Sequence, residues 1–568
     1  PRRSKIGFLR VLIALVLAAT SAQAKPPTLT GFFPAGAVPG QSLSVTASGR
    51  FDHWPVGCWV EEGAGLAIRP AKEKGTLTIE VAKDAAPGVR WIRLYDKDGA
   101  TSLRPFLVGI GGLAEVLEAE PNDDPRKPQA IDRARATING RLARSGDVDG
   151  YSVPLERGEV LAADLEANRR LGSPMDAVLQ VVSSKGFVLA QNNDTVGDDP
   201  RIIFEAPAKG TYTVRLFAFP SKPDSSIRFS GGSAYVYRLT LTTGGFIEHA
   251  FPLAYSPNRV NPIAAIGPNI NSNGEAVILP VSIGDQPIDR MILAHPALPG
   301  TAEIRRVDDA VDVAIESEPN DPARPRRIVD RTAVSGRIDP PGDQDAYEVP
   351  LKKGDRRIIR LESRTFGLPL DAVLRILGAD GTILAEADDV GKSSDPELVF
   401  SPPADGVYRI VVRDLHRRGG ARYVYLLSVI PPEPSFAATL AADAFELVPG
   451  KETKVVVTID RKEGYNDTLD ITAVGLPRGV TATTVHSRHS DASAKSATLE
   501  LRGDANAPAQ SGPFRIIVYR ADGKGRTHHA LARIDGSDEA ATTAQTEHLW
   551  LTSLPAAPPS TSPSSKKK

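Results

Sequence analysis

At 568 residues the chain is too long for a single hydrophobic core, and its 47 Pro, 49 Gly and 6% aromatic content favour many short strands joined by turns over long helices. The formal net charge of −1 offers no overall field for nucleic acid or an acidic membrane surface. Cys58 is the one cysteine, which excludes an internal disulfide, and we interpret it as a half-buried small side chain beside Trp54 and Trp59.

Residues 1–24 have the three parts of a signal peptide. A basic head precedes an apolar run at 11–19 that is shorter than a membrane span, and Ala22-Gln23-Ala24 forms a small-x-small cleavage site. An uncleaved anchor is disfavoured because Lys25-Pro26-Pro27 follows at once. We therefore expect an exported protein, in the periplasm, at the cell surface or outside the cell, with no membrane span after signal cleavage.

Residues 25–112 show the pattern of half-buried strands. Apolar and polar residues alternate in Leu43-Ser44-Val45-Thr46-Ala47 and again in Leu77-Thr78-Ile79-Glu80-Val81. About seven short strands of this kind favour an immunoglobulin-like sandwich. The entry Phe33-Pro34-Ala35-Gly36 resembles that of the transcription-factor-type immunoglobulin domains of exported bacterial proteins.

An acidic motif then occurs twice. Glu118-Ala119-Glu120-Pro121-Asn122-Asp123 returns as Glu316-Ser317-Glu318-Pro319-Asn320-Asp321, and the turn Gly146-Asp147-Val148-Asp149-Gly150-Tyr151 returns as Gly342-Asp343-Gln344-Asp345-Ala346-Tyr347. Further landmarks follow in the same order in both copies, including an Asp-Ala-Val-Leu strand and a Gly-x-Tyr strand. Self-similarity of this length indicates an internal duplication, with one β-sandwich at 116–244 and another at 315–431.

The remaining segments complete the predicted domain order. Residues 245–314 are shorter and less regular, which leaves a small β domain or a packed linker open. A second immunoglobulin-like domain is expected at 435–535, and the Ala, Thr, Ser and Pro content of 536–568 predicts a disordered tail. The fold class is thus all-β, with tandem immunoglobulin-like and jelly-roll-like β-sandwiches joined by linkers.

The spacing within the repeated motif suits a cation. Glu118 and Glu120 lie two residues apart, so in an extended segment their carboxylates point the same way, and Asp147 and Asp149 alternate in the same manner. Asn122-Asp123 forms a turn that can bring further oxygens to the same point. Ca²⁺ takes six to eight oxygen ligands, and the absence of His and Cys from either cluster disfavours zinc.

Two other interpretations stay open for these acids. The carboxylates can be solvated surface with ordinary turn chemistry, and magnesium is an alternative to calcium. Calcium is favoured because clustered carboxylates repel one another without a cation and because the same spacing occurs twice. The additional pairs Asn193-Asp194 and Asp388-Asp389 are interpreted as hairpin turns.

The ordered motifs together resemble the bacterial pre-peptidase C-terminal domain, over roughly two fifths of the chain. That family includes the collagen-binding domains of clostridial collagenases and implies a jelly-roll-like β-sandwich often carried by secreted peptidases. Its collagen-contacting surface has no motif that maps here, so collagen affinity is not carried over. In the collagen-binding members the acidic segment and the Asp-x-Asp turn hold calcium. Carried over by motif, the implied calcium ligands are Glu118, Glu120, Asn122, Asp123, Asp147 and Asp149 in the first repeat and Glu316, Glu318, Asn320, Asp321, Asp343 and Asp345 in the second.

Catalytic motifs are missing from the sequence. It contains no His-Glu-x-x-His, no Gly-x-Ser-x-Gly and no Gly-rich phosphate loop, although a triad assembled from distant residues remains open. We therefore predict an exported, non-catalytic binding or scaffold protein with two calcium-stabilised repeats, whose ligand is an extracellular protein or a polysaccharide and not nucleic acid. The alternative is a secreted peptidase or a peptidase-accessory protein.

Overall fold

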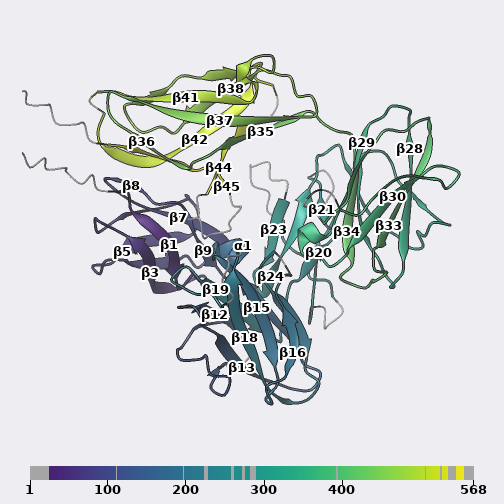
Figure 1. The fold of residues 1–568 in the computed structure, drawn as a ribbon, viewed down its shortest axis with the longest axis horizontal. Coiled ribbons are helices and arrows are strands. Elements are labelled where there is room, and N and C mark those ends of the chain that lie inside the picture. The colour runs from purple at the N-terminus through teal and green to yellow at the C-terminus, as the bar shows by residue number, and fades with distance from the viewer. Residues whose placement is uncertain are drawn as a thin grey trace, which may run out of the picture.

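The computed structural model describes residues 25–110, 112–132, 134–195, 197–222, 228–257, 261–270, 275–281, 290–389, 391, 394–505, 507–524, 527–534 and 545–554. The predicted signal peptide, 1–24, lies outside the described residues. Within them the chain is a series of β domains with three one-turn helices, which confirms the predicted all-β class of tandem sandwiches (Figure 1). No described helix has the length and hydropathy to cross a membrane.

The first domain is a sandwich of two sheets, ordered β1-β3-β6-β5 and β2-β9-β7-β4. Its alternating strands bury one face, with Val45, Leu77 and Ile79 in the core between the sheets. Cys58 is half-buried, and burial raises the pKa of its thiol to about 11. The strands are β1 Thr28–Phe33, β2 Gly36–Ala37, β3 Ser42–Arg50, β4 Gly57–Val60, β5 Leu66–Pro70, β6 Thr76–Val81, β7 Gly88–Asp96, β8 Gly99–Ala100 and β9 Arg104–Val108.

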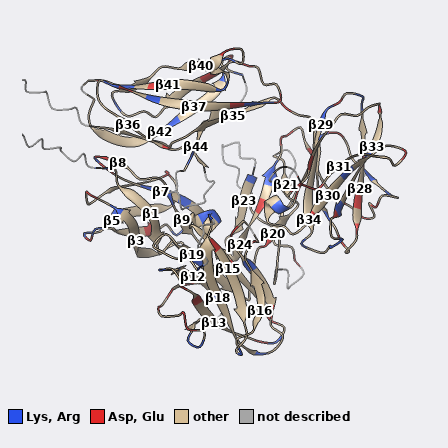
Figure 2. Cartoon of the chain, viewed as in Figure 1, with Lys and Arg blue, Asp and Glu red and all other residues tan. Residues whose placement is uncertain are grey.

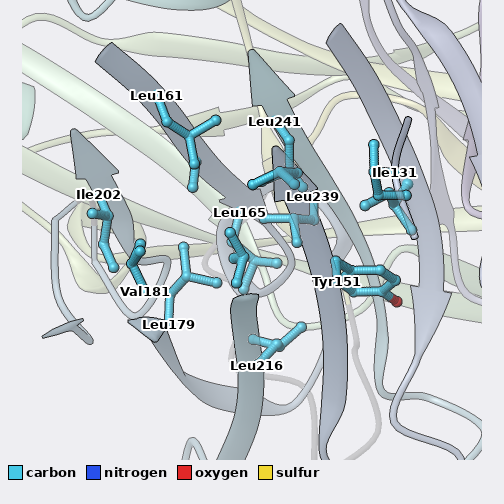
Figure 3. Packing of buried hydrophobic residues seen from close by; sticks show 14 of the residues in the cluster. Ile131, Tyr151, Leu161, Leu165, Leu179, Val181, Ile202, Leu216, Leu239 and Leu241 are labelled. Atoms are coloured by element: carbon cyan, nitrogen blue, oxygen red, sulfur yellow. The ribbon is translucent and has the colours of Figure 1, made fainter. Parts of the chain in front are cut away.

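The first repeat folds as two five-stranded sheets, ordered β10-β12-β19-β14-β17 and β11-β13-β18-β15-β16. Figure 3 shows side chains from both sheets, among them Leu161, Leu179 and Leu239, meeting in its core. The elements are β10 Ala114–Leu117, β11 Gln129–Ala130, β12 Arg135–Arg141, β13 Asp149–Leu155, β14 Val160–Glu166, α1 Asn168–Leu171, β15 Met175–Val182, β16 Val188–Asn192, β17 Arg201–Glu205, β18 Gly210–Pro220 and β19 Val236–Thr242.

The second repeat has the same strand order, with sheets β25-β27-β34-β29-β32 and β26-β28-β33-β30-β31. Every element of the first repeat has its counterpart, and a 3₁₀ turn, η1, replaces α1. The elements are β25 Asp312–Ile315, β26 Arg326–Arg327, β27 Thr332–Arg337, β28 Gln344–Leu351, β29 Arg357–Glu362, η1 Arg364–Phe366, β30 Ala372–Leu377, β31 Ile383–Ala387, β32 Glu397–Phe400, β33 Gly406–Asp414 and β34 Val424–Ile430.

The segment between the repeats is a small β domain, because it buries a core of its own that includes Ile247, Ile263 and Ile304. Its strands are β20 His249–Phe251, β21 Ala254–Tyr255, β22 Ala264–Ile266, β23 Arg290–His295 and β24 Leu298–Arg306.

This small domain repeats one edge of the first domain. β2 runs parallel to β9 with Gly36 opposite Leu107, and β21 runs parallel to β24 with Ala254 opposite Arg305. The backbone hydrogen bonds agree, since Leu107 N donates to Ala35 O at 2.9 Å and Arg305 N donates to Leu253 O at 2.8 Å. The chain therefore contains a duplicated pair of domains, each pair consisting of an entry domain and a repeat.

The two entry domains dock on their repeats in the same way. Ala35 packs with Leu171 and Val236 of the first repeat, and the corresponding Leu253 packs with Phe366 and Val424 of the second. At the first joint Arg238 lies against the entry domain and forms an ion pair with Glu115 at 2.6 Å. A Cβ atom on Gly36 would lie 2.3 Å from the backbone oxygen of Leu107, so glycine is required there.

The last domain is a sandwich with sheets β39-β41-β37-β35-β44-β45 and β36-β46-β42-β38-β40, with β43 paired to β42. Its elements are β35 Ser435–Leu440, β36 Ala444–Leu447, β37 Glu452–Lys462, β38 Leu469–Val474, β39 Val480–Ala482, β40 Val485–Ser487, η2 Ala492–Ala494, β41 Ser496–Gly503, β42 Gln510–Arg520, β43 His528–His529, β44 Leu531–Arg533, β45 Gln545–Thr546 and β46 Leu549–Ser553.

The last strand corrects the predicted tail at 536–568. β46 pairs with both β36 and β42, and Trp550 is only 2% exposed. The polar composition around Leu549–Ser553 concealed this five-residue strand, whose residues are all buried.

The last domain also contacts the first, where β46 lies against β8 (Figure 1 labels β8). Arg93 is 0% exposed, and its Nη2 lies 2.7 Å from Asp443 Oδ2, across 350 positions of sequence. Trp550 packs beside this ion pair, against Trp59 and Tyr95. Both signs of charge are interspersed over the described domains (Figure 2), in keeping with the net charge of −1.

Candidate metal centres

The parallel pairing of β10 with β12 places the acidic motif beside the Asp-x-Asp turn. Glu118 N donates to Asn139 O at 3.0 Å, which extends the pairing past the end of β10. The motif then turns back over the start of β13, where Asp149 is the first strand residue and where a Cβ on Gly150 would lie 3.2 Å from Asn122 O. Two segments that are distant in sequence thus converge at one end of the sandwich.

In the first repeat this convergence forms a cluster of carboxylates, here called site 1. Ligand atoms of Glu120, Asp123, Asp147 and Asp149 all lie within 4.8 Å of one another. Asp147 is 1% exposed and Asp149 is 0% exposed. A set of only oxygen donors, partly buried and negatively charged, matches what calcium and magnesium prefer.

Buried oxygen atoms without hydrogen-bond partners surround site 1. Among the described residues they are Glu118 Oε1, Asn122 Oδ1, Asp123 Oδ1, Asp147 Oδ1 and Asp149 Oδ1. A buried polar atom left unpaired costs about 1–3 kcal/mol, so five in one place would be strongly destabilising unless something else satisfied them. A cation at their centre would do so.

The pKa values at site 1 also show that burial and mutual repulsion oppose the charged form of these carboxyl groups. Burial, followed by the charge of Glu118, raises the pKa of Asp149 to about 10. Burial also raises the pKa of Glu118 and that of Asp147. The carboxyl groups cannot all be charged at neutral pH without a compensating positive charge, and a divalent cation reverses that preference.

A pair of tyrosines holds the innermost carboxylate from the core side. Tyr237 donates its hydroxyl hydrogen bond to Asp149 Oδ2 at 2.5 Å, and the hydroxyls of Tyr151 and Tyr237 lie 2.5 Å apart. Tyr237 reaches this position because Gly140 faces it, where a Cβ would lie 2.2 Å from the ring. Tyr151 itself lies within the core cluster (Figure 3).

The second repeat builds the same arrangement, here called site 2. Ligand atoms of Glu316, Glu318 and Asp345 lie within 4.8 Å of one another. Tyr425 donates to Asp345 Oδ2 at 2.5 Å, and its hydroxyl lies 2.7 Å from that of Tyr347. Burial is the largest cause that raises the pKa of Asp345 to about 9 and that of Glu316 to about 7.

Asn320 lies against two carboxylates of site 2. It is fully buried, and one terminal amide atom lies 2.9 Å from Glu318 Oε2 and 3.0 Å from Asp345 Oδ1. As nitrogen, that atom donates to both carboxylates. As oxygen, the same atom would face the oxygens of Glu318 and Asp345. A cation bound between these three side chains would then be needed to offset the repulsion among their oxygens.

The two sites differ at their outer acids. Asp123 keeps one oxygen in the cluster while the other pairs with Arg144 at 2.9 Å. Asp321, its counterpart, pairs with Arg324 at 2.6 Å and accepts the backbone N–H of Ala323. Asp343 accepts backbone N–H groups with both oxygens, one from Asp339 and one from Gln344. Site 2 therefore gathers fewer free carboxylates than the sequence pattern predicts.

Sequence reasoning missed Tyr237 and Tyr425. A signal was present, because Tyr235-Val236-Tyr237 and Tyr423-Val424-Tyr425 occupy equivalent places in the two repeats. The prediction that Asn193-Asp194 and Asp388-Asp389 are hairpin turns was wrong. These pairs lie in loops that carry the chain from one sheet to the other, from β16 to β17 and from β31 to β32.

Comparisons with known proteins bear on parts of the chain. No family model matches it. It is 33% identical over 109 residues to a Deinococcus radiodurans protein described as a probable subtilase-type serine protease, which is 19% of this chain and 15% of that protein.

Solved structures show likeness in fold alone. The pre-peptidase C-terminal domain of a Bacillus anthracis collagenase is similar to 21% of this chain over 100% of its own length, with 16% identity and a TM-score of 0.16. The fibronectin(III)-like modules of Clostridium thermocellum CbhA are similar to 42% of this chain over 92% of their own length, with 10% identity and a TM-score of 0.12. The four N-terminal immunoglobulin domains of Dscam1 are similar to 93% of this chain over 97% of their own length, with 8% identity and a TM-score of 0.18.

Proposed function

We propose that this is an exported, non-catalytic binding or scaffold protein whose two repeats each hold a calcium ion at the joint with the preceding domain. The observation that carries the proposal is the set of five unpartnered buried oxygens at site 1, four of them from carboxylates and one from an amide. The protein acts in the periplasm, at the cell surface or outside the cell, on an extracellular protein or polysaccharide.

The position of the sites supports a mechanical role for the ion. Arg141 N donates to Glu118 Oε2 at 2.8 Å, and the guanidinium of the same residue lies 4.9 Å from the ring centroid of Phe33 in the entry domain. In the second pair, Leu253 N of the entry domain donates to Ser335 Oγ at 2.9 Å, and Glu316 N donates to Ser335 O at 3.0 Å. An ion bound at either site would therefore stiffen the joint next to it.

Calcium is expected to stabilise the full chain, and chelation is expected to reverse the effect. A ligand at about one hundred times its Kd adds about 2.7 kcal/mol to the free energy of unfolding of the domain that binds it. Thermal denaturation of the mature chain in millimolar calcium and in EDTA measures this shift. Asp149→Ala should remove the shift of the first repeat, whereas the control Asp194→Ala, in an exposed loop, should keep it. Identical melting curves with and without chelator would contradict the calcium proposal.

Two classes of calcium site are expected, with site 1 the tighter. Site 1 offers four clustered carboxylates, and at site 2 Asp321 is engaged by Arg324. Calorimetric titration of the calcium-free chain should resolve two affinities. Asp149→Ala should abolish the tighter one and Asp345→Ala the weaker one. A single class that survives both substitutions would show that the ions bind elsewhere.

A secreted peptidase or a peptidase-accessory protein is the second candidate, favoured by the identity with part of a probable serine protease. Incubation of the purified mature chain with casein tests the peptidase, and an inert chain would leave only the accessory role of this second candidate. No hydrolysis is expected. Cleavage that persists in Asp149→Ala and Asp345→Ala would instead support a peptidase with a triad assembled from distant residues.

A further inference from the structure

A cleft of about 720 Å³ lies between the first domain and the last. This volume is within the range of about 300–1,000 Å³ that is usual for ligand sites, and such sites favour domain interfaces. The first domain contributes Trp59, Glu61 and Glu62. The last domain contributes Val474, Gly475, Pro513, Phe514, Arg515 and His548.

The contacts beside the cleft fix its two walls relative to each other. The buried ion pair of Arg93 with Asp443 joins the domains, and the guanidinium of Arg93 lies 5.7 Å from the ring centroid of Trp550. His548 Nε2 lies 3.2 Å from Glu61 Oε1, and its ring centroid lies 5.3 Å from that of Trp59. The cleft is therefore built only when the ends of the chain are docked.

The lining combines aromatic surface with polar groups at the rim. Trp59 is half-buried, and Val474 and Pro513 are exposed on the facing wall. Glu61 and Arg515 are more than a third exposed, and each also has an ion-pair partner beside the cleft, His548 at 3.2 Å and Glu547 at 3.4 Å. Glu62 is exposed and has no ion-pair or hydrogen-bond partner among the described residues.

This lining selects the chemistry of the ligand. An indole face binds a flat apolar surface, and carboxylates and a guanidinium bond to hydroxyl groups around it. The C–H face and hydroxyl edge of a pyranose ring have this combination. The negative charges of Glu61, Glu62 and the nearby Glu547 disfavour binding of a phosphate or another polyanion.

We propose that this cleft binds a neutral oligosaccharide, with one sugar ring stacked on Trp59 and its hydroxyls bonded to Glu61, Glu62 and Arg515. The site rests on the proposed binding function and is independent of the two cation sites.

The test is calorimetric titration of the full mature chain with cellohexaose, xylohexaose and chitohexaose, in calcium and again in EDTA. Binding of at least one probe is expected in both solutions. Trp59→Ala should weaken it at least tenfold, since the substitution removes the aromatic surface on which the sugar ring stacks and the apolar area that stacking buries. Glu62→Gln should weaken it several-fold, and the matched control Glu73→Gln, on an exposed loop of the same domain, should leave it unchanged.

Other outcomes overturn the proposal. No heat with any of the three probes, or binding that neither Trp59→Ala nor Glu62→Gln alters, excludes a saccharide site in this cleft. Binding of a casein peptide that Trp59→Ala abolishes would assign the cleft to a protein ligand. Because Glu62 and Arg515 lie at the rim, Glu62→Gln and Arg515→Gln test the site even if Trp59→Ala separates the domains. Saccharide binding in EDTA without any calcium effect on melting would sustain the cleft and contradict the cation sites.

Discussion

Arg93→Leu is expected to undock the last domain from the first. The substitution leaves the carboxylate of Asp443, which is 3% exposed, without its cation in a buried interface. Removal of one partner of a buried ion pair costs about 3–5 kcal/mol, because the remaining charge stays desolvated. The Thr101 carbonyl, which accepts from Arg93 Nη1 at 2.8 Å, loses its partner as well. Small-angle scattering of the full chain should report a larger radius of gyration.

A double-mutant cycle separates this effect from a general loss of stability. Arg93→Leu combined with Asp443→Leu should recover much of the interface, since an apolar pair of similar volume often replaces a buried ion pair without net cost. The control is Arg69→Leu, which removes an exposed ion pair with Glu80 and should change the free energy of unfolding by about 0–1 kcal/mol. An unchanged radius of gyration in Arg93→Leu would mean that other contacts hold the two domains together.

Local pattern predicted the sandwiches well but could not predict this closure. Alternating strands and repeated landmarks depend on residues close in sequence, and the structure confirms the all-β class that they indicate. The pairing of Arg93 with Asp443 spans 350 positions, and neither residue stands in a motif. Burial of an ion pair of this kind is decided by how whole domains dock, which periodicity does not encode.

The candidate metal centres were likewise predicted in part, where the prediction depended on local sequence alone. Side-chain alternation was sufficient to single out the carboxylates, because side chains two residues apart on an extended strand lie on the same face. It could not foresee that Arg324 takes Asp321 away from site 2, nor that Tyr237 crosses from another strand to reach Asp149. Both depend on a partner placed by tertiary packing. The duplication of the entry domain was also concealed, since among the described strands the order β2-β9-β7 recurs as β21-β24-β23 while the rest of the first sandwich has no counterpart there.

Acidification is expected to destabilise the joint between the repeats through His249. This side chain is 3% exposed, and neither ring nitrogen has a hydrogen-bond partner among the described residues. Burial, followed by the charges of Arg422, Arg201 and Arg337, lowers its pKa to about 4. Glu248, the nearest acid in sequence, is itself paired with Arg422 at 2.7 Å, so it does not favour protonation of the imidazole.

The sign and size of the effect follow from the difference between the folded and unfolded pKa values. The unfolded chain binds a proton near pH 6.5 and the folded chain only near pH 4, so stability is complete above about pH 6.5 and falls as the pH drops towards 4. The loss amounts to about 3 kcal/mol, since each pKa unit corresponds to about 1.4 kcal/mol. Urea denaturation of the full chain at pH 7.0 and pH 4.5 measures it. His249→Leu and the smaller change His249→Gln should both reduce the pH dependence, and the exposed control His489→Gln should retain it. If His249 takes up a proton on unfolding, replacing it must reduce the pH dependence of the free energy of unfolding. Equal pH dependence in the wild type and both His249 variants would therefore show that other groups govern acid stability.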